Sequence, residues 1–292
     1  MIIRDLIKIY SDKLLDISDT ARLDIEMLLC RALGDVDRIY IHMNIDAELE
    51  KEKELEFIRM FEDRLSGRPI AYILNNREFM SLDFYVEEGV LIPRPDTEIL
   101  VEEIIEIYKD KNNNSNKPTD QIKIVEIGTG SGAIAVSLAK YLEDSEVISL
   151  DISDKALQIG ERNAVDNDVI DRVSFKKSNL FSAIESENLK FDVVVSNPPY
   201  IRKSDMDGLQ TQVKDFEPTL ALDGGVDGLD FYRNITSEAK KYLVHGGMLA
   251  YEVGHDQAED VTSILKKEGF KRIYTKKDLQ SIDRVVIGLN LW

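Results

Sequence analysis

Apolar residues recur at helical spacing through the first part of the chain. The stretch "LIKIYSDKLL" has this period, and "ARLDIEMLLCRAL" follows Ser18, Asp19 and Thr20, which are favourable helix-capping residues. The charged stretch "AELEKEKELEFIRMFEDRLSG" carries an apolar stripe along one face, and Gly67 can end it. The pattern predicts a small helical-bundle domain over residues 1–75.

The pattern changes after residue 75. "FMSLDFYV" and "GVLI" are short strand-like runs on either side of Glu87-Glu88-Gly89, so a β-hairpin linker is predicted over residues 76–93. Pro95 can open a helix through "DTEILVEEIIEIYK", with acidic residues in its first turn. The polar run "KDKNNNSNKPTDQ", residues 109–121, predicts a surface loop.

Strand and helix patterns alternate from Ile122 onward, which predicts an α/β doubly wound sheet within residues 94–292. Seven strands are expected, and the short connection "DLQSIDR" makes the last two an antiparallel hairpin at the end of an otherwise mostly parallel sheet. The expected strands are "IKIVEI", "EVISLD", "RVSFKKS", "FDVVVSN", "GMLAYEV", "RIYTKK" and "RVVIGLN".

Composition narrows the class of protein. Cys30 is the only cysteine among 292 residues, so there is no internal disulfide framework, and a reducing compartment is favoured. No apolar run is long enough to cross a membrane, and the amphipathic start differs from a signal peptide, so we expect a cytoplasmic protein. The net charge of −18, with acidic residues in excess in both parts, disfavours a nucleic-acid partner.

A glycine-rich segment, "VEIGTGSGAIAVSLA", follows the first predicted strand of the sheet. Gly128, Gly130 and Gly132 allow a tight turn and close approach of a ligand at the start of a helix. Asp151 ends the next strand, where a carboxylate can bind ribose hydroxyls. This signal leaves a nicotinamide cofactor and S-adenosylmethionine open. The C-terminal hairpin favours the Rossmann-like class I methyltransferase fold, in which Glu126 could hold the methionine ammonium or simply lie at a strand end.

The strand "FDVVVS" ends abruptly in Asn197-Pro198-Pro199-Tyr200. A site that methylates an amide-type nitrogen must hold its N–H groups so that the lone pair points at the methyl group. The Asn197 side-chain oxygen can accept one N–H and the Pro198 carbonyl the other, while the prolines stiffen the turn and Tyr200 covers the planar group. No metal or covalent nucleophile is needed for this chemistry, although a rigid turn alone would have the same sequence.

"NPPY" together with "EIGTGSG" resembles the methyltransferases that act on exocyclic amino or amide nitrogens. The segments "GRPIAYIL", "EFMSLDFYVEEGVLIPRPDTE", "FEPTLALDGGVDGLDFYRNI" and "YEVGHDQ" narrow this to the release-factor glutamine methyltransferases, the HemK or PrmC family. The resemblance covers nearly the whole chain. It implies methyl transfer from S-adenosylmethionine to the side-chain amide N5 of the glutamine in the Gly-Gly-Gln loop of class 1 peptide chain release factors, with S-adenosylhomocysteine as product.

The resemblance also implies roles for particular residues. It assigns cofactor contacts to Gly128, Thr129, Gly130, Ser131, Gly132, Asp151, Leu180 and Asn197. The family often has an acidic residue and then Trp where this chain has Asn179 and Leu180. The Asn179 oxygen can still accept a hydrogen bond from adenine, and Leu180 can pack on the ring. Arg94 in "IPRPDTE" and Glu217 are expected at the substrate side, with a helix start and a structural turn as the respective alternatives.

Two other functions stay open at this level. A nitrogen methyltransferase acting on DNA or RNA would share "NPPY", but no basic segment interleaved with aromatic residues is present. A non-enzymatic adaptor that only binds the cofactor or a ribosomal partner would not need Asn197 and Tyr200 together with the glycine segment and Asp151. His255 is better explained as a surface or strand-end residue than as a general base.

Overall fold

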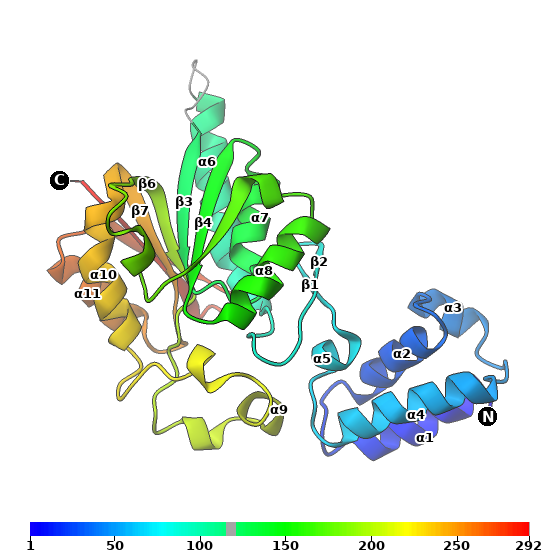
Figure 1. Cartoon of the computed structure of the whole chain (residues 1–292). Coiled ribbons are helices and arrows are strands. Elements are labelled where there is room, and N and C mark those ends of the chain that lie inside the picture. Colours follow the sequence, from blue (N-terminus) through cyan, green and yellow to red (C-terminus); the bar gives the residue numbers. More distant parts are fainter. Residues whose placement is uncertain (115–120, 292) are drawn as a thin grey trace. The chain divides into compact units, whose positions relative to one another are not determined.

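The computed structural model describes residues 1–114 and 121–291, which form two compact units (Figure 1). The first unit comprises Met1–Asn76 with Gln210–Phe216, and the second comprises Arg77–Leu209 with Glu217–Trp292. The sequence pattern places Gln210–Phe216 in the α/β part of the chain, whereas its contacts group it with the N-terminal helices. None of the helices in the described ranges combines the length and the apolar character needed to cross a bilayer.

The first unit is the predicted helical bundle. The partly buried ring of Tyr10 packs edge-on against the core residues Phe57 and Phe61 at centroid distances of 5.1 and 4.6 Å. Arg64 and Asp24 form a buried ion pair at 2.7 Å, so the charges within the bundle are neutralised. The helices are α1 (Ile3–Leu14), α2 (Ala21–Ala32), α3 (Arg38–Met43), α4 (Lys51–Leu65), α5 (Ile70–Leu74) and α9 (Thr211–Lys214).

The hairpin that follows turns earlier than the sequence analysis predicts. Strands β1 (Arg77–Phe79) and β2 (Leu82–Phe84) pair antiparallel, so the turn lies at Met80-Ser81 and not at residues 87–89. Met80 and Ser81 take left-handed φ angles of 52° and 57°, as a two-residue hairpin turn requires. The prediction of a strand in "GVLI" is wrong: the segment is buried at several positions but pairs with no strand.

The second unit contains a seven-stranded sheet in the order β5-β4-β3-β6-β7-β9-β8. The first five strands of this order are parallel, and β9 pairs antiparallel with both β7 and β8. The predicted α/β fold with a C-terminal antiparallel hairpin is therefore confirmed. The strands are β3 (Ile122–Ile127), β4 (Ser145–Asp151), β5 (Val173–Lys177), β6 (Phe191–Ser196), β7 (Leu243–Glu252), β8 (Lys271–Lys277) and β9 (Asp283–Leu289).

Helices cover both faces of the sheet. Helices α6 (Pro95–Asn114), α7 (Ala133–Tyr141) and α8 (Asp154–Asp166) lie on one face, and α10 (Asp230–Tyr242) and α11 (Ala258–Lys267) on the other (Figure 1). Successive strand residues alternate between the two faces, so Ile124 and Val125 are both buried in separate apolar clusters. Short 3₁₀ turns at Ile170–Arg172, Ser182–Ile184, Met206–Gly208 and Thr219–Ala221 lie within the connections.

Helix α6 starts at Pro95, as the sequence predicts, but it ends later. The predicted loop over residues 109–121 begins with helical residues, because α6 continues to Asn114. The rest of that predicted loop, residues 115–120, lies outside the described part of the chain.

Candidate active site

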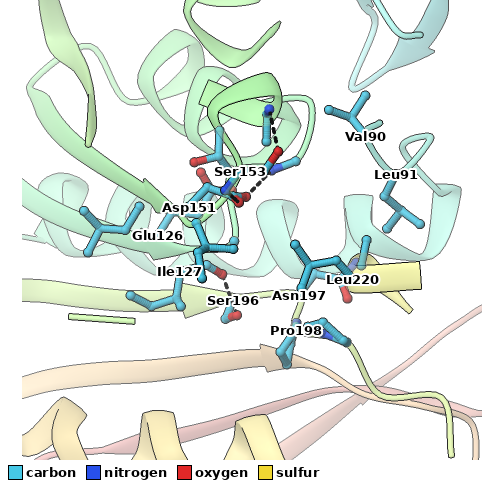
Figure 2. A pocket seen from close by; sticks show the side chains of 18 of the residues that line it. Val90, Leu91, Glu126, Ile127, Asp151, Ser153, Ser196, Asn197, Pro198 and Leu220 are labelled. Carbon is cyan, nitrogen blue, oxygen red and sulfur yellow. Dashed lines mark hydrogen bonds between the residues drawn. The ribbon is translucent and has the colours of Figure 1, made fainter. Parts of the chain in front are cut away.

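A pocket of about 280 Å³ lies beyond the carboxyl ends of β3, β4 and β6. Strand β3 lies between the other two, so the chain winds in opposite directions from it, and open α/β sheets bind ligands at such a point. Residues between 89 and 97, between 178 and 180 and between 218 and 221 also line it. Figure 2 shows Glu126 and Asp151 on one side of this pocket and Val90 and Leu91 on the other.

The predicted glycine segment forms the loop between β3 and α7. Gly132 has a φ of 80°, and a Cβ atom there would lie 2.9 Å from the Cα atom of Gly160 in α8. Only a glycine therefore allows the loop to pack this closely on α8. Gly128, Gly130 and the first residues of α7 line the pocket as a result, whereas Gly132 itself does not.

Asp151 lies at the end of β4 with its carboxylate held by the backbone. One side-chain oxygen accepts from the N–H of Gly130 at 3.1 Å, and the other accepts from the N–H of Ser153 at 2.8 Å (Figure 2). A carboxylate oxygen can accept a second hydrogen bond, so both oxygens retain capacity for a ligand. The carboxylate is thus oriented before any ligand binds.

Replacing Asp151 with alanine is expected to weaken S-adenosylmethionine binding about ten- to a hundredfold, because hydrogen bonds to a charged group are worth about 1.5–3 kcal/mol each. Titration calorimetry measures this affinity, and thermal unfolding checks that the protein stays folded. Asp154→Ala is the matched control, since Asp154 is an exposed carboxylate in the same connection that does not line the pocket. An Asp151→Ala protein with parental affinity would exclude the ribose contact.

Glu126 is a fully buried carboxyl group at the pocket wall. The hydroxyl of Ser149 and the backbone N–H of Ala135 donate to it, and Ser149 also exchanges a hydrogen bond of 2.7 Å with Thr129. Burial raises the pKa of Glu126 to about 8, and the negative charge of Asp151 adds to the effect. At neutral pH the carboxyl group of the protein alone is therefore largely protonated.

If Glu126 faces the cofactor ammonium, its pKa falls when S-adenosylmethionine binds, and binding releases a proton. The free protein holds the extra proton below about pH 8, so affinity should rise by about 25-fold between about pH 6 and about pH 7.5. Calorimetry in two buffers of different ionisation enthalpy measures the released proton directly. Glu126→Gln should bind with little dependence on pH, and an equally steep dependence in that variant would assign the proton to another group.

The expected adenine side of the pocket contains Asn179 and Leu180. Both line the pocket. Leu180 has a left-handed φ of 51°, and its carbonyl accepts a hydrogen bond from the Ser178 hydroxyl at 2.6 Å, which stabilises this turn. Sequence reasoning missed Ile152, which also lines the pocket and is 50% exposed. Its signal is an apolar residue placed directly after the acidic end of a strand. Ile152 and Leu180 together supply apolar surface on this side of the pocket.

Asn197 follows the last residue of β6 and lines the same pocket as Asp151. The hydroxyl of Ser196 donates to the carbonyl of Ile127 at 2.7 Å, which ties the ends of β6 and β3 together (Figure 2). The Asn197 amide nitrogen donates to the Thr97 hydroxyl at 3.2 Å, and no group in the described residues donates to its Oδ1. Pro198 and Pro199 also line the pocket.

Of three other predicted site residues, one lines the pocket and two do not. Arg94 lines the pocket, and its guanidinium forms an ion pair with the buried Glu217, which also accepts from the Ile92 N–H at 3.3 Å. Glu217 therefore fixes Arg94 and does not itself line the pocket. Tyr200 does not line it either: its hydroxyl donates to Glu252 at 3.4 Å, and its carbonyl accepts from Gln257. The expectation that Tyr200 covers the substrate amide does not match this placement.

Comparison with known families matches both parts of the chain. A family model described as "Methyltransferase domain" matches residues 118–282, and a second, "PrmC N-terminal domain", matches residues 5–74. The first agrees with the α/β unit and its pocket, and the second with the helical bundle. Each part of the chain thus has its own counterpart among known domains.

Individual relatives cover nearly the whole chain. It is similar to a release factor glutamine methyltransferase of Clostridium acetobutylicum, with 44% identity over 97% of this chain and 96% of the relative. One from Geobacter sulfurreducens is 40% identical over 92% and 90%. Among solved structures, the N-terminal domain of human METTL16 in complex with S-adenosylhomocysteine shares the fold, with a TM-score of 0.53, 19% identity and coverage of 80% and 84%.

Proposed function

The chain belongs to the release factor glutamine methyltransferase family, and from this membership we infer that it methylates a release factor at a glutamine side chain. The methyl donor is S-adenosylmethionine, and the enzyme is a protein-(glutamine-N5) methyltransferase. Its substrate glutamine is the one in the Gly-Gly-Gln motif of class 1 peptide chain release factors, so the reaction would modulate translation termination.

The observation that carries this function is the shared pocket of the glycine loop and Asn197. Asp151 and Glu126 offer carboxylates for the ribose hydroxyls and the ammonium of S-adenosylmethionine, and Ile152 and Leu180 offer apolar surface for its adenine. Asn197 lies within the same lining, with an unused acceptor oxygen. A cofactor and a glutamine amide can therefore meet in one place.

The residues around Asn197 suit an amide nitrogen, which is a weak nucleophile because its lone pair is delocalised. Asn197 Oδ1 accepts one N–H of the glutamine amide, and the Pro198 carbonyl accepts the other. S-adenosylmethionine supplies the methyl group from its positively charged sulfur. The amide nitrogen would form the new N–C bond as the S–C bond breaks, and one of its two protons would pass to water, leaving S-adenosylhomocysteine. Asn197 and the rigid Pro198-Pro199 turn contribute orientation and electrostatic stabilisation.

The helical unit is proposed to recognise the release factor. It is not needed to build the pocket, whose lining belongs entirely to the second unit. Its short helix α3 exposes Ile39, Tyr40 and Met43, at 67%, 45% and 80%. Exposed apolar side chains of this kind mark surfaces that bind other proteins.

A nitrogen methyltransferase acting on nucleic acid is the alternative to test. The net charge of −18 speaks against it, because phosphate binding depends on Lys and Arg. The experiment compares label transfer from methyl-labelled S-adenosylmethionine to a class 1 release factor and to DNA and RNA. Label in the release factor alone supports the proposal, and label in nucleic acid alone would overturn it. A substrate in the translation machinery also agrees with the expected cytoplasmic location, which stays a prediction.

A further inference from the structure

A chain of hydrogen bonds leads from Asn197 through Thr97, which also lines the pocket, to the buried carboxyl of Glu252. Asn197 Nδ2 donates to the Thr97 hydroxyl, and this hydroxyl donates to Oε2 of Glu252. Thr97 is 4% exposed and Glu252 is 2% exposed. We propose that Thr97 and Glu252 are positioning residues that hold the Asn197 amide with its oxygen toward the substrate. The inference rests on the proposed function, which gives that oxygen its role.

The fold brings these three side chains together from distant parts of the sequence. Ser196 pairs with Tyr251 in the sheet, so Asn197 and Glu252 leave the ends of neighbouring parallel strands side by side. Thr97 lies in the first turn of α6 and bridges the two. Each residue comes from a segment that the sequence analysis singled out: "IPRPDTE", "NPPY" and "YEVGHDQ".

The number of protons on the Thr97 hydroxyl determines the direction of these hydrogen bonds. A threonine hydroxyl has one proton, and here that proton goes to the Glu252 carboxylate, which is the stronger acceptor. The oxygen of Thr97 is then left only as an acceptor toward Asn197. Asn197 must therefore turn its NH₂ group to Thr97, and its Oδ1 is the end that remains for a substrate N–H.

Tyr200 takes part in the same network, which explains why this residue follows Asn197 without lining the pocket. Its hydroxyl donates to the second oxygen of Glu252 at 3.4 Å, while the hydroxyl of Tyr232 donates to the Glu252 backbone carbonyl at 2.9 Å. The charged groups near the carboxyl are Asp96 and Arg284, which act on it in opposite directions. The Glu252 carboxylate thus accepts from two hydroxyl groups and orients both ends of "NPPY".

Protonation of Glu252 would reverse the direction of the hydrogen bonds from Asn197 through Thr97 to Glu252. Burial raises the pKa of Glu252 to about 7, and Asp96 contributes in the same direction, whereas Thr97, Arg284 and Tyr200 oppose it. A protonated carboxyl would donate to Thr97, whose own proton would then turn toward Asn197. The amide would have to present its oxygen to Thr97 and would lose its acceptor for the substrate. Turnover should therefore fall as the pH drops below about 7.

The test compares two substitutions at Thr97 with a matched control. Thr97→Val keeps the shape but removes the hydroxyl, and kcat should fall about tenfold or more, while the Kd for S-adenosylmethionine changes less than about twofold. Thr97→Ser keeps the hydroxyl and should restore most of kcat. Thr236→Val is the control, because it removes an equally buried hydroxyl, bonded to Tyr251, outside the chain and the pocket. It should lower thermal stability but leave kcat near the parental value.

The pH profile separates positioning from a structural role. The acidic limb of kcat that we expect for the parent should be absent from Glu252→Gln and from Thr97→Val. A Thr97→Val enzyme with parental kcat would overturn the inference. A Thr97→Ser enzyme whose kcat falls as far as that of Thr97→Val would overturn it as well. So would an unchanged acidic limb in Glu252→Gln.

A measurement without turnover keeps this inference distinct from the proposed function. The side-chain amide signal of Asn197 in ¹⁵N NMR, assigned by its loss in Asn197→Ala, should shift with pH in the parent but not in Thr97→Val. If the parent fails to methylate a release factor, the proposed function fails, and this signal still decides the positioning role. A signal that does not titrate in the parent would overturn the inference.

Discussion

Asn197→Ala should lower kcat for glutamine methylation by about a hundredfold to a thousandfold, the loss typical of removing one preorganised polar group that orients or stabilises the reacting atoms. The substitution removes the acceptor oxygen for the substrate amide. It leaves Asp151, Glu126 and the glycine loop intact, so S-adenosylmethionine should bind with an affinity much closer to that of the parent.

Single-turnover methylation and calorimetry on the same preparation measure the two effects separately. Asn234→Ala is the matched control, because Asn234 is an exposed asparagine of α10 that does not line the pocket. An Asn197→Ala enzyme that methylates at close to the parental rate would refute the role given to Asn197. A loss of cofactor affinity as large as the loss of kcat would instead make Asn197 mainly a cofactor residue.

Removal of the helical unit should reduce kcat/KM on an intact release factor by about a hundredfold, but should change activity on a short glutamine peptide much less. One glutamine side chain offers little area, whereas a specific protein complex usually buries about 1,200 Å² or more. A chain that begins at Asn76 retains every residue of the pocket lining, so its S-adenosylmethionine affinity is the check that it folds.

Truncation also removes the partners of Gln210–Phe216, so a second experiment uses the full-length chain. Ile39→Ser combined with Met43→Ser changes only exposed side chains of α3 and should also lower kcat/KM on the intact factor. The same double change at two other exposed residues, Leu15 directly after α1 and Leu55 in α4, serves as comparison. Equal losses on factor and peptide in the folded truncated chain would leave the helical unit with a supporting role only.

The sequence was sufficient to predict the elements whose cause is local. The nearly continuous apolar runs of β3 and β6, and the glycines before α7, predict the central strands and the loop between β3 and α7. The hairpin was harder, because Met80 and Ser81 are not residues that usually adopt left-handed angles. Their turn depends on tertiary contacts: Glu98 accepts from the Met80 N–H at 2.6 Å, and the Tyr141 hydroxyl donates to the Met80 carbonyl.

The site shows the same division. The placement of Asp151 and Asn197 in one pocket follows from their positions at the carboxyl ends of β4 and β6, the two strands that flank β3. The function of Tyr200 and Glu217 depends on long-range partners, Glu252 and Arg94, that spacing along the chain does not reveal. In the sequence, the buried Glu252 is recognisable only as an acidic residue at the end of an otherwise apolar strand.

Methylation of the release factor at its glutamine is the central claim, and fragment mass spectrometry tests it most directly. A class 1 release factor is incubated with this protein and S-adenosylmethionine, then digested, and the peptide with the Gly-Gly-Gln motif is sequenced by fragmentation. We predict one added methyl group on the side chain of that glutamine, absent when the cofactor is omitted and strongly reduced with Asn197→Ala. An unmodified glutamine, or a methyl group on another residue, would contradict the assignment.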